Sequence, residues 1–107
     1  MGKYIYLYRG PATSPADQTP EQTAEIMAAW EKWMGSLGSA LVDGGAPFGE
    51  RTAVVDDGSS TSASDLNGYT IVQADSLDAA RKHTADHPFL SEGKGRFTLE
   101  VFELLPM

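Results

Sequence analysis

The sequence has no cysteine and only two histidines among its 107 residues. Without thiols it can form no disulfide, no thiolate nucleophile and no sulfur-ligated zinc site. It also lacks the apolar run of about 18 residues or more that a membrane-spanning helix needs, so we expect no membrane association. The first residues run directly into an alternating strand pattern, with no apolar stretch typical of a secretory signal. We therefore expect a cytoplasmic protein.

Positive charge is scarce as well. Eight lysines and arginines stand against 15 acidic residues, and the net charge is −7. Such a surface repels phosphate backbones, so we expect no nucleic-acid partner. The glycines do not have the spacing of a phosphate-binding loop and no cofactor motif is visible, so we expect no cofactor. The length corresponds to one domain, residues 1–107.

The apolar pattern predicts the order strand, helix, strand, strand, helix, strand. Alternating large residues predict strands at 3–9, 41–55, 68–74 and 97–105, and the regular part of the second strand is expected at 51–55. Thr19, Pro20 and Gln22 form a typical helix N-terminus, and apolar residues at helical spacing follow them. Together they predict a first helix of about five turns. A second, shorter helix is expected at 75–85, and loops at 10–18 and 56–67.

This order predicts an α+β fold of the ferredoxin-like, βαββαβ type. Right-handed crossovers give a four-stranded antiparallel sheet with two helices on one face. The first strand carries large side chains on both faces, because Tyr4, Tyr6 and Tyr8 alternate with Ile5 and Leu7. A second covered face is explained most economically by a second copy of the chain. We therefore predict a homodimer.

The stretch 41–48, LVDGGAPF, is the most unusual segment of the sequence, because two glycines and a proline interrupt a strand pattern. Its Asp43 is a candidate catalytic carboxylate, or caps its own turn through its side chain. The expected topology brings His87 close to Arg9 at a loop-rich edge. His87 is a candidate general base, or a structural residue. Arg9 is a candidate for binding a substrate carboxylate, or pairs with a neighbouring acid.

Aromatic and histidine side chains supply the remaining candidates. Tyr6 and Tyr8 are candidate substrate-binding residues that line a cleft, or they belong to the dimer interface. Trp30 and Trp33 lie on the apolar stripe of the first helix and are expected in the core. His83 and His87 stand four residues apart, a spacing that can hold a metal, but no third ligand is near in sequence, so we expect no metal site.

Four segments together resemble the YCII-related family, in particular its DGPF branch. They are KYIYLYR at 3–9, LVDGGAPF at 41–48, GYTIVQADSLDAA at 68–80 and HPFL at 87–90. The resemblance covers nearly the whole chain and implies a dimeric α+β barrel related to the ferredoxin-like fold. A histidine and aspartate pair has been proposed as catalytic in this family, which implies His87 and Asp43 here. The name-giving Asp-Gly-Pro-Phe is expanded in this chain to DGGAPF.

Most members of the family have no established reaction, and some are encoded beside sigma factors. We expect a small organic molecule bound in a dimer cleft, with cofactor-free acid–base chemistry by His87 together with Asp43 or Arg9. The alternative is a non-catalytic binding or regulatory module, for example one linked to transcription through a sigma-factor partner. A redox or haem enzyme is disfavoured because only two histidines are present.

Overall fold

The computed structural model describes residues 1–11 and 19–106, so most of the loop predicted at 10–18 lies outside the described residues. The elements follow the predicted order, with two short 3₁₀ turns and two short strands added. They are β1 (Gly2–Arg9), α1 (Pro20–Leu37), η2 (Gly38–Ala40), β2 (Leu41–Asp43), β3 (Ala53–Val54), β4 (Ser60–Thr61), β5 (Leu66–Ala74), α2 (Leu77–Lys82), η3 (Pro88–Leu90) and β6 (Thr98–Leu104). None of the helices among these residues is both long and apolar enough to span a bilayer.

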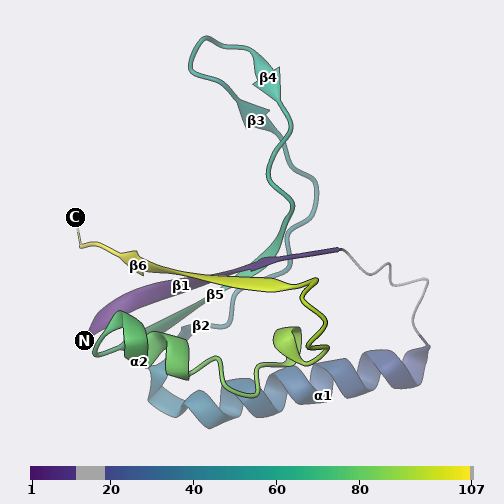
Figure 1. The fold of residues 1–107 in the computed structure, drawn as a ribbon, viewed down its shortest axis with the longest axis vertical. Helices are drawn as coiled ribbons and strands as arrows, with labels where there is room; N and C mark the ends of the chain where they lie inside the picture. Colours follow the sequence, from purple (N-terminus) through teal and green to yellow (C-terminus); the bar gives the residue numbers. More distant parts are fainter. Residues whose placement is uncertain (12–18, 107) are drawn as a thin grey trace.

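The main sheet has four antiparallel strands in the order β2-β5-β1-β6. Both α1 and α2 lie under the same face of this sheet (Figure 1). This is the ferredoxin-like arrangement that the order of elements predicts, and it confirms the predicted fold class. β1 is central and pairs with β5 on one side and β6 on the other. Its side chains therefore set the spacing between the sheet and the helices.

The core lies between β1 and the helices. The three tyrosines of β1 point into it, namely Tyr4, Tyr6 and Tyr8. They are at most 4% exposed, as are Trp33 of α1 and Val72 of β5. The alternative that this tyrosine stripe forms the dimer interface is therefore wrong. Because side chains alternate along a strand, the stripe and the helices share one face, and the opposite face carries Ile5 and Leu7.

The ends of the helices follow from capping chemistry. Thr19 and Gln22 form the predicted capping box, in which the Gln22 backbone N–H donates to Thr19 Oγ1 at 3.1 Å and the Thr19 N–H donates to Gln22 Oε1 at 2.9 Å. α1 then runs for 18 residues, which is the predicted five turns. Ser76 caps α2, which ends at Lys82, earlier than predicted.

The prediction for the second strand is wrong in its regular part. Only β2 joins the main sheet, whereas β3 pairs with β4 in a separate two-stranded ribbon. Residues 49–65, which we call the arm, project away from the sheet on the side opposite the helices (Figure 1). Gly45 has φ +77°, and Pro47 makes only an isolated bridge to Gly68, so the ladder cannot continue past β2. The loop predicted at 56–67 accordingly contains β4 and the start of β5.

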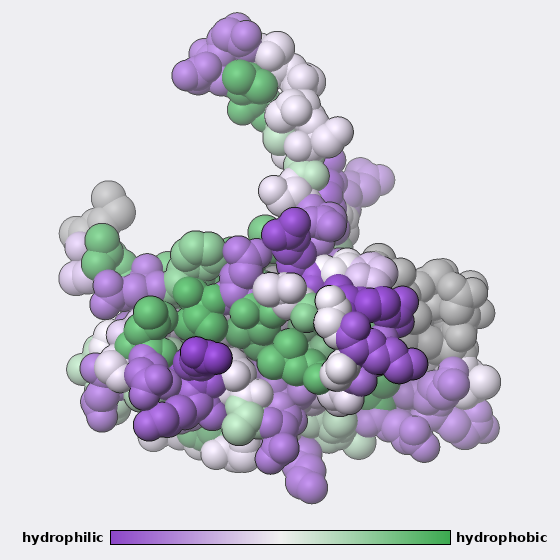
Figure 2. All heavy atoms as spheres, in the orientation of Figure 1, coloured by the Kyte–Doolittle hydropathy of each residue, from purple (hydrophilic) through white to green (hydrophobic). Residues whose placement is uncertain are grey.

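The face of the sheet opposite the helices, which we call the open face, is apolar. Ile5 of β1 pairs with Ile71 of β5 on one side and with Phe102 of β6 on the other. Phe102 is 48% exposed and Leu104 is 37% exposed. Figure 2 shows hydrophobic side chains gathered at the level of β6, beneath the arm. No helix of the described residues covers this face (Figure 1).

Gly45 is a position that only glycine can occupy. A Cβ at Gly45 would lie 1.6 Å from the carbonyl oxygen of Tyr69, whereas a Cβ at Gly58, which also has a positive φ, would meet nothing within 4 Å. We predict that Gly45→Ala lowers the free energy of unfolding by about 3 kcal/mol or more, and Gly58→Ala by about 1 kcal/mol. Urea unfolding of both variants measures the difference. Equal losses would contradict the close approach of this segment to β5.

Candidate functional site

His87 lies in the apolar core although it is a titratable residue. It is 1% exposed, and its ring centroid is 4.0 Å from that of Trp33 and 4.8 Å from that of Trp30. Burial among these rings disfavours the charged imidazolium and lowers the pKa of His87 to about 4. His87 is therefore neutral at pH 7.

The hydrogen bonds of His87 fix which ring nitrogen carries the proton. Nδ1 accepts from the backbone N–H of Phe89 at 3.1 Å, because His87 caps the turn η3. In the neutral ring the proton is then on Nε2, which lies 2.9 Å from the hydroxyl of Tyr8. His87 thus donates to Tyr8, and its accepting nitrogen is already occupied.

The chain of hydrogen bonds continues from Tyr8 in one direction. The Tyr8 hydroxyl donates to Thr70 Oγ1 at 2.7 Å, and Thr70 Oγ1 donates to the backbone oxygen of Gly44 at 3.3 Å. Burial raises the pKa of Tyr8 well above its usual range, so the phenol keeps its proton. The polar network therefore runs from η3 through the core to the segment that follows β2. We call it the His87 relay.

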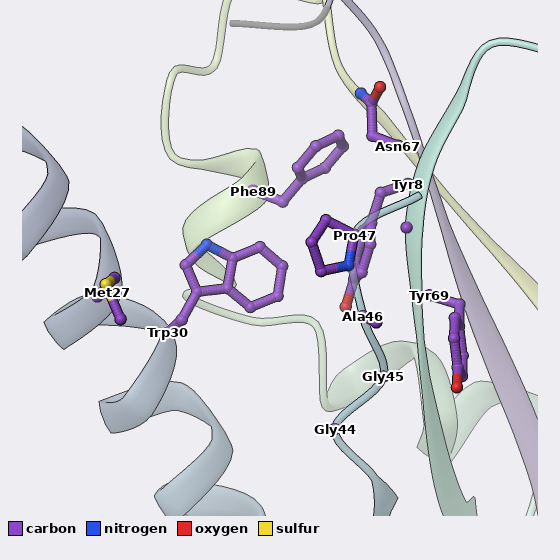
Figure 3. Close-up of a pocket in the computed structure, with 11 residues that line it drawn as sticks. Tyr8, Met27, Trp30, Gly44, Gly45, Ala46, Pro47, Asn67, Tyr69 and Phe89 are labelled. Atoms are coloured by element: carbon purple, nitrogen blue, oxygen red, sulfur yellow. The ribbon is translucent and has the colours of Figure 1, made fainter. Parts of the chain in front are cut away.

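A cavity of about 470 Å³ lies beside this relay (Figure 3). Three aromatic side chains from separate elements line it, namely Tyr8 of β1, Trp30 of α1 and Phe89 of η3. The segment 44–47 lines it too, and Figure 3 shows the Pro47 ring turned toward Trp30 across the space. We call this cavity the aromatic pocket. Its aromatic lining suits a largely apolar molecule with a ring that can pack against these side chains.

The aromatic walls are held by contacts with one another. The Tyr8 ring stands edge-on to Trp30 at a centroid distance of 5.3 Å and lies 4.9 Å from Phe89. Both Tyr8 and Trp30 also contact the ring of His87. The imidazole thus supports the pocket from behind and does not line it.

Asp43 shapes the wall at 44–47 from outside the pocket. Its Oδ1 accepts from the backbone N–H of Gly45 at 2.8 Å, and its Oδ2 accepts from the Tyr69 hydroxyl at 3.3 Å. The adjacent carboxylate raises the pKa of Tyr69. This is the turn-capping arrangement that the sequence offers as an alternative. Within the described residues no hydrogen bond joins Asp43 to His87 directly; the relay ends at the next residue, Gly44.

The remaining predicted site residues lie elsewhere. Arg9 pairs with Asp65 at 3.5 Å, with both side chains mostly exposed, and it does not line the aromatic pocket. Tyr6 is fully buried and donates to the backbone oxygen of Ala80. Of the residues predicted from the sequence, the structure brings Tyr8 into hydrogen-bond contact with His87, and the Tyr6 ring stands edge-on to that of His87 at a centroid distance of 6.5 Å.

Sequence reasoning missed several residues of the site. The apolar stripe predicts Trp30 in the core, yet Trp30 lines the pocket together with Phe89. The signal for Thr70 is a hydroxyl that alternates with Val72 and Ala74 on the buried face of β5. Such a group needs a buried partner, and Tyr8 supplies it.

Acid is expected to weaken the fold through His87. Because the unfolded chain protonates this histidine near pH 6.5 and the folded chain only near pH 4, stability is lost as the pH falls through that window, by about 3 kcal/mol. His87→Gln should be less stable than wild type at pH 7, and the gap should shrink as the pH approaches 4. Urea unfolding at both pH values measures it. His83→Gln is the control, and its free energy of unfolding should change between the two pH values as that of wild type does. If the difference between His87→Gln and wild type stayed constant, His87 would not be the group that causes the acid sensitivity.

Comparison with known proteins places the chain in a family. No curated protein sequence is significantly similar to it. A solved structure of 5-chloro-2-hydroxyhydroquinone dehydrochlorinase from Burkholderia phenoliruptrix AC1100, in complex with 2,5-dihydroxybenzoquinone, is similar in fold, with 16% identity, a TM-score of 0.58 and coverage of 96% of this chain and 93% of that one. A dimeric, ferredoxin-like protein of unknown function from Bacteroides fragilis NCTC 9343 also matches at 16% identity, with a TM-score of 0.43 and coverage of 95% and 94%. The sequence matches the YCII-related domain over residues 1–104, and the chain belongs to that family.

Proposed function

We propose that this chain binds a small, flat organic molecule in the aromatic pocket. The observation that carries the proposal is the set of three aromatic rings that, with the 44–47 segment, line a cavity of about 470 Å³. A ring inserted there would stack against Trp30 and Pro47 and contact Phe89 edge-on. The lining residues carry no charged side chain, and their polar side-chain groups are those of Asn67, the two tyrosines Tyr8 and Tyr69, and the indole N–H of Trp30, so the ligand is mostly apolar.

A solved structure of the same fold supports this ligand class. The dehydrochlorinase from Burkholderia phenoliruptrix was determined with 2,5-dihydroxybenzoquinone, which is a flat six-membered ring bearing oxygens. The aromatic pocket, with a volume of about 470 Å³, is of the size that small-molecule sites have. Shared family membership does not fix the reaction, since the identity is 16%.

The proposal assigns indirect roles to the two residues expected to be catalytic. His87 is a positioning residue, because its buried ring donates to Tyr8 and has no free accepting nitrogen for a substrate. Asp43 is a positioning residue too, because it fixes the turn at Gly45 that walls the pocket. The Tyr8 hydroxyl is occupied as well, because it accepts from His87 and its proton goes to Thr70, so it too acts by holding its ring in place. A purely binding or regulatory module would use the same pocket without turnover.

Replacing Trp30 tests the binding proposal. We predict that 2,5-dihydroxybenzoquinone or a related flat aromatic compound binds wild type, and that Trp30→Ala weakens binding about tenfold or more through loss of ring contact. Isothermal titration calorimetry measures both affinities. Lys32→Ala, an exposed change on the same helix away from the pocket, should bind as wild type does. Equal affinity of Trp30→Ala and wild type would contradict binding in this pocket.

We also propose that a second copy of the chain covers the open face. A bare apolar face of this kind, with Ile5, Ile71 and Phe102 at its centre, is costly in water. The arm rises on the same side, and its Val54 is 73% exposed, so a twofold partner seated on the sheet would lie within the arm's reach. A two-stranded ribbon this short is marginal alone, which favours its packing on that partner.

A single charge on the open face tests the dimer. Ile71→Glu is expected to yield a monomer. A twofold interface would bury one new carboxylate from each copy, and neither would have a partner of opposite charge. Sedimentation velocity measures the mass. Leu77→Glu, which changes a 54% exposed leucine of α2 on the helix side of the sheet, should leave the dimer intact. A wild-type monomer, or a dimeric Ile71→Glu, would overturn the proposal.

A further inference from the structure

A second hollow adjoins the aromatic pocket and contains a charge. It has a volume of about 560 Å³ and shares four lining residues with the pocket, namely Trp30, Pro47, Asn67 and Phe89. The two hollows are therefore neighbours that meet at these side chains. The second hollow adds Arg51, at the base of the arm, and Glu92, which follows η3.

The Arg51 guanidinium is held in place by neutral acceptors only. Its Nη1 donates to the backbone oxygens of Leu66 at 2.6 Å and Ser64 at 3.1 Å, and its Nε donates to that of Gly49 at 3.3 Å. Its Nη2 donates to the backbone oxygen of Phe48 at 3.5 Å, so one Nη2 N–H is left over. The ion pairs formed within the described part of the chain use other cations, which are Arg9, Lys82 and Arg96. Arg51 is thus a fixed positive charge without a carboxylate partner among these residues.

The one acidic group of this hollow is already neutralised. Glu92 accepts from Arg96 Nε at 2.8 Å and from Arg96 Nη2 at 2.9 Å, a bidentate pair. The arginine in turn lies over the ring of Phe97, 5.6 Å from its centroid. Glu92 and Arg96 cancel, which leaves Arg51 as the net charge of the hollow. The chain as a whole has a net charge of −7, so this hollow differs from the rest of the protein in attracting anions.

We propose that the ligand of the aromatic pocket carries an acidic group, and that Arg51 binds it. The ring lies in the aromatic pocket and the carboxylate extends past Pro47 and Asn67 to the guanidinium. This inference rests on the proposed function, since it names the ligand class of the same site. The Nη2 N–H that these bonds leave over can donate one charge-assisted hydrogen bond to a carboxylate. Partial exposure to water limits the gain, so we expect about tenfold in affinity over a neutral ligand of the same shape.

A matched pair of ligands tests the charge. We would titrate wild type with 2-naphthoate and with 2-naphthamide, which share the ring and differ in charge, and measure both affinities by calorimetry. The carboxylate should bind about tenfold more tightly, and 0.5 M added salt should reduce that preference. Arg51→Gln should abolish the preference while the affinity for 2-naphthamide stays unchanged. Arg9→Gln, which removes another exposed arginine of the chain, should keep the preference for 2-naphthoate.

The outcomes separate this inference from the binding proposal. If both ligands bind equally and Trp30→Ala weakens both, the acidic ligand is overturned and the pocket stands. If Arg51→Gln loses both ligands alike, Arg51 is only a clamp for the arm and the inference fails. If Arg9→Gln loses the preference as well, the attraction is not local to Arg51 and the inference fails. If neither ligand binds wild type, the inference is overturned together with the proposed ligand class.

Discussion

The backbone N–H of Phe89 determines the chemistry of the whole site. By donating to Nδ1 of His87, it leaves the proton of the neutral ring on Nε2 and turns the histidine into a donor toward Tyr8. Tyr8 must then donate onward to Thr70, whose own proton goes to Gly44. If the imidazole were protonated, Nδ1 would carry a proton as well as Nε2. Two donors, Nδ1–H and the backbone N–H of Phe89, would then face each other. Both this conflict and the apolar surroundings keep His87 neutral, and the ring can then support the aromatic wall without a counter-ion.

The relay also explains why a polar network crosses an aromatic core. Each buried hydroxyl or ring nitrogen in it has a partner, and within the described residues no buried side-chain nitrogen or oxygen is left unpaired. A satisfied network of this kind fixes the rotamers of its members, so the Tyr8 ring can stand in one orientation against Trp30 and Phe89. The position of the Tyr8 ring in the pocket wall is therefore a consequence of hydrogen bonding as much as of packing.

The sequence predicts the elements better than it predicts their contacts. Periodicity and the Thr19 capping box place β1, α1, β5, α2 and β6, because those signals are local. The failure at 51–55 has a different origin: Ala53 and Val54 have strand propensity, but the conformation at Gly45 redirects the chain before they can join the sheet. His87 could be found as a candidate from residue type alone. Its burial, its tautomer and its neighbours Thr70 and Trp30 depend on contacts between distant segments, which no periodicity encodes.

Tyr69 connects the two surfaces on which function is proposed. Its backbone lies against Gly45 at the edge of the aromatic pocket, whereas its ring is drawn on the far side of β5 from Trp30 in Figure 3. There it stacks on Phe48 at a centroid distance of 5.8 Å, and its hydroxyl reaches Asp43. A second copy seated on the open face would restrict this ring and, through Asp43, the turn at Gly45 that walls the pocket. With the proposed ligand and the proposed partner copy both bound, the shape of the pocket and the occupancy of the open face would be coupled through Tyr69, because a strand presents its backbone and its side chain to different neighbours.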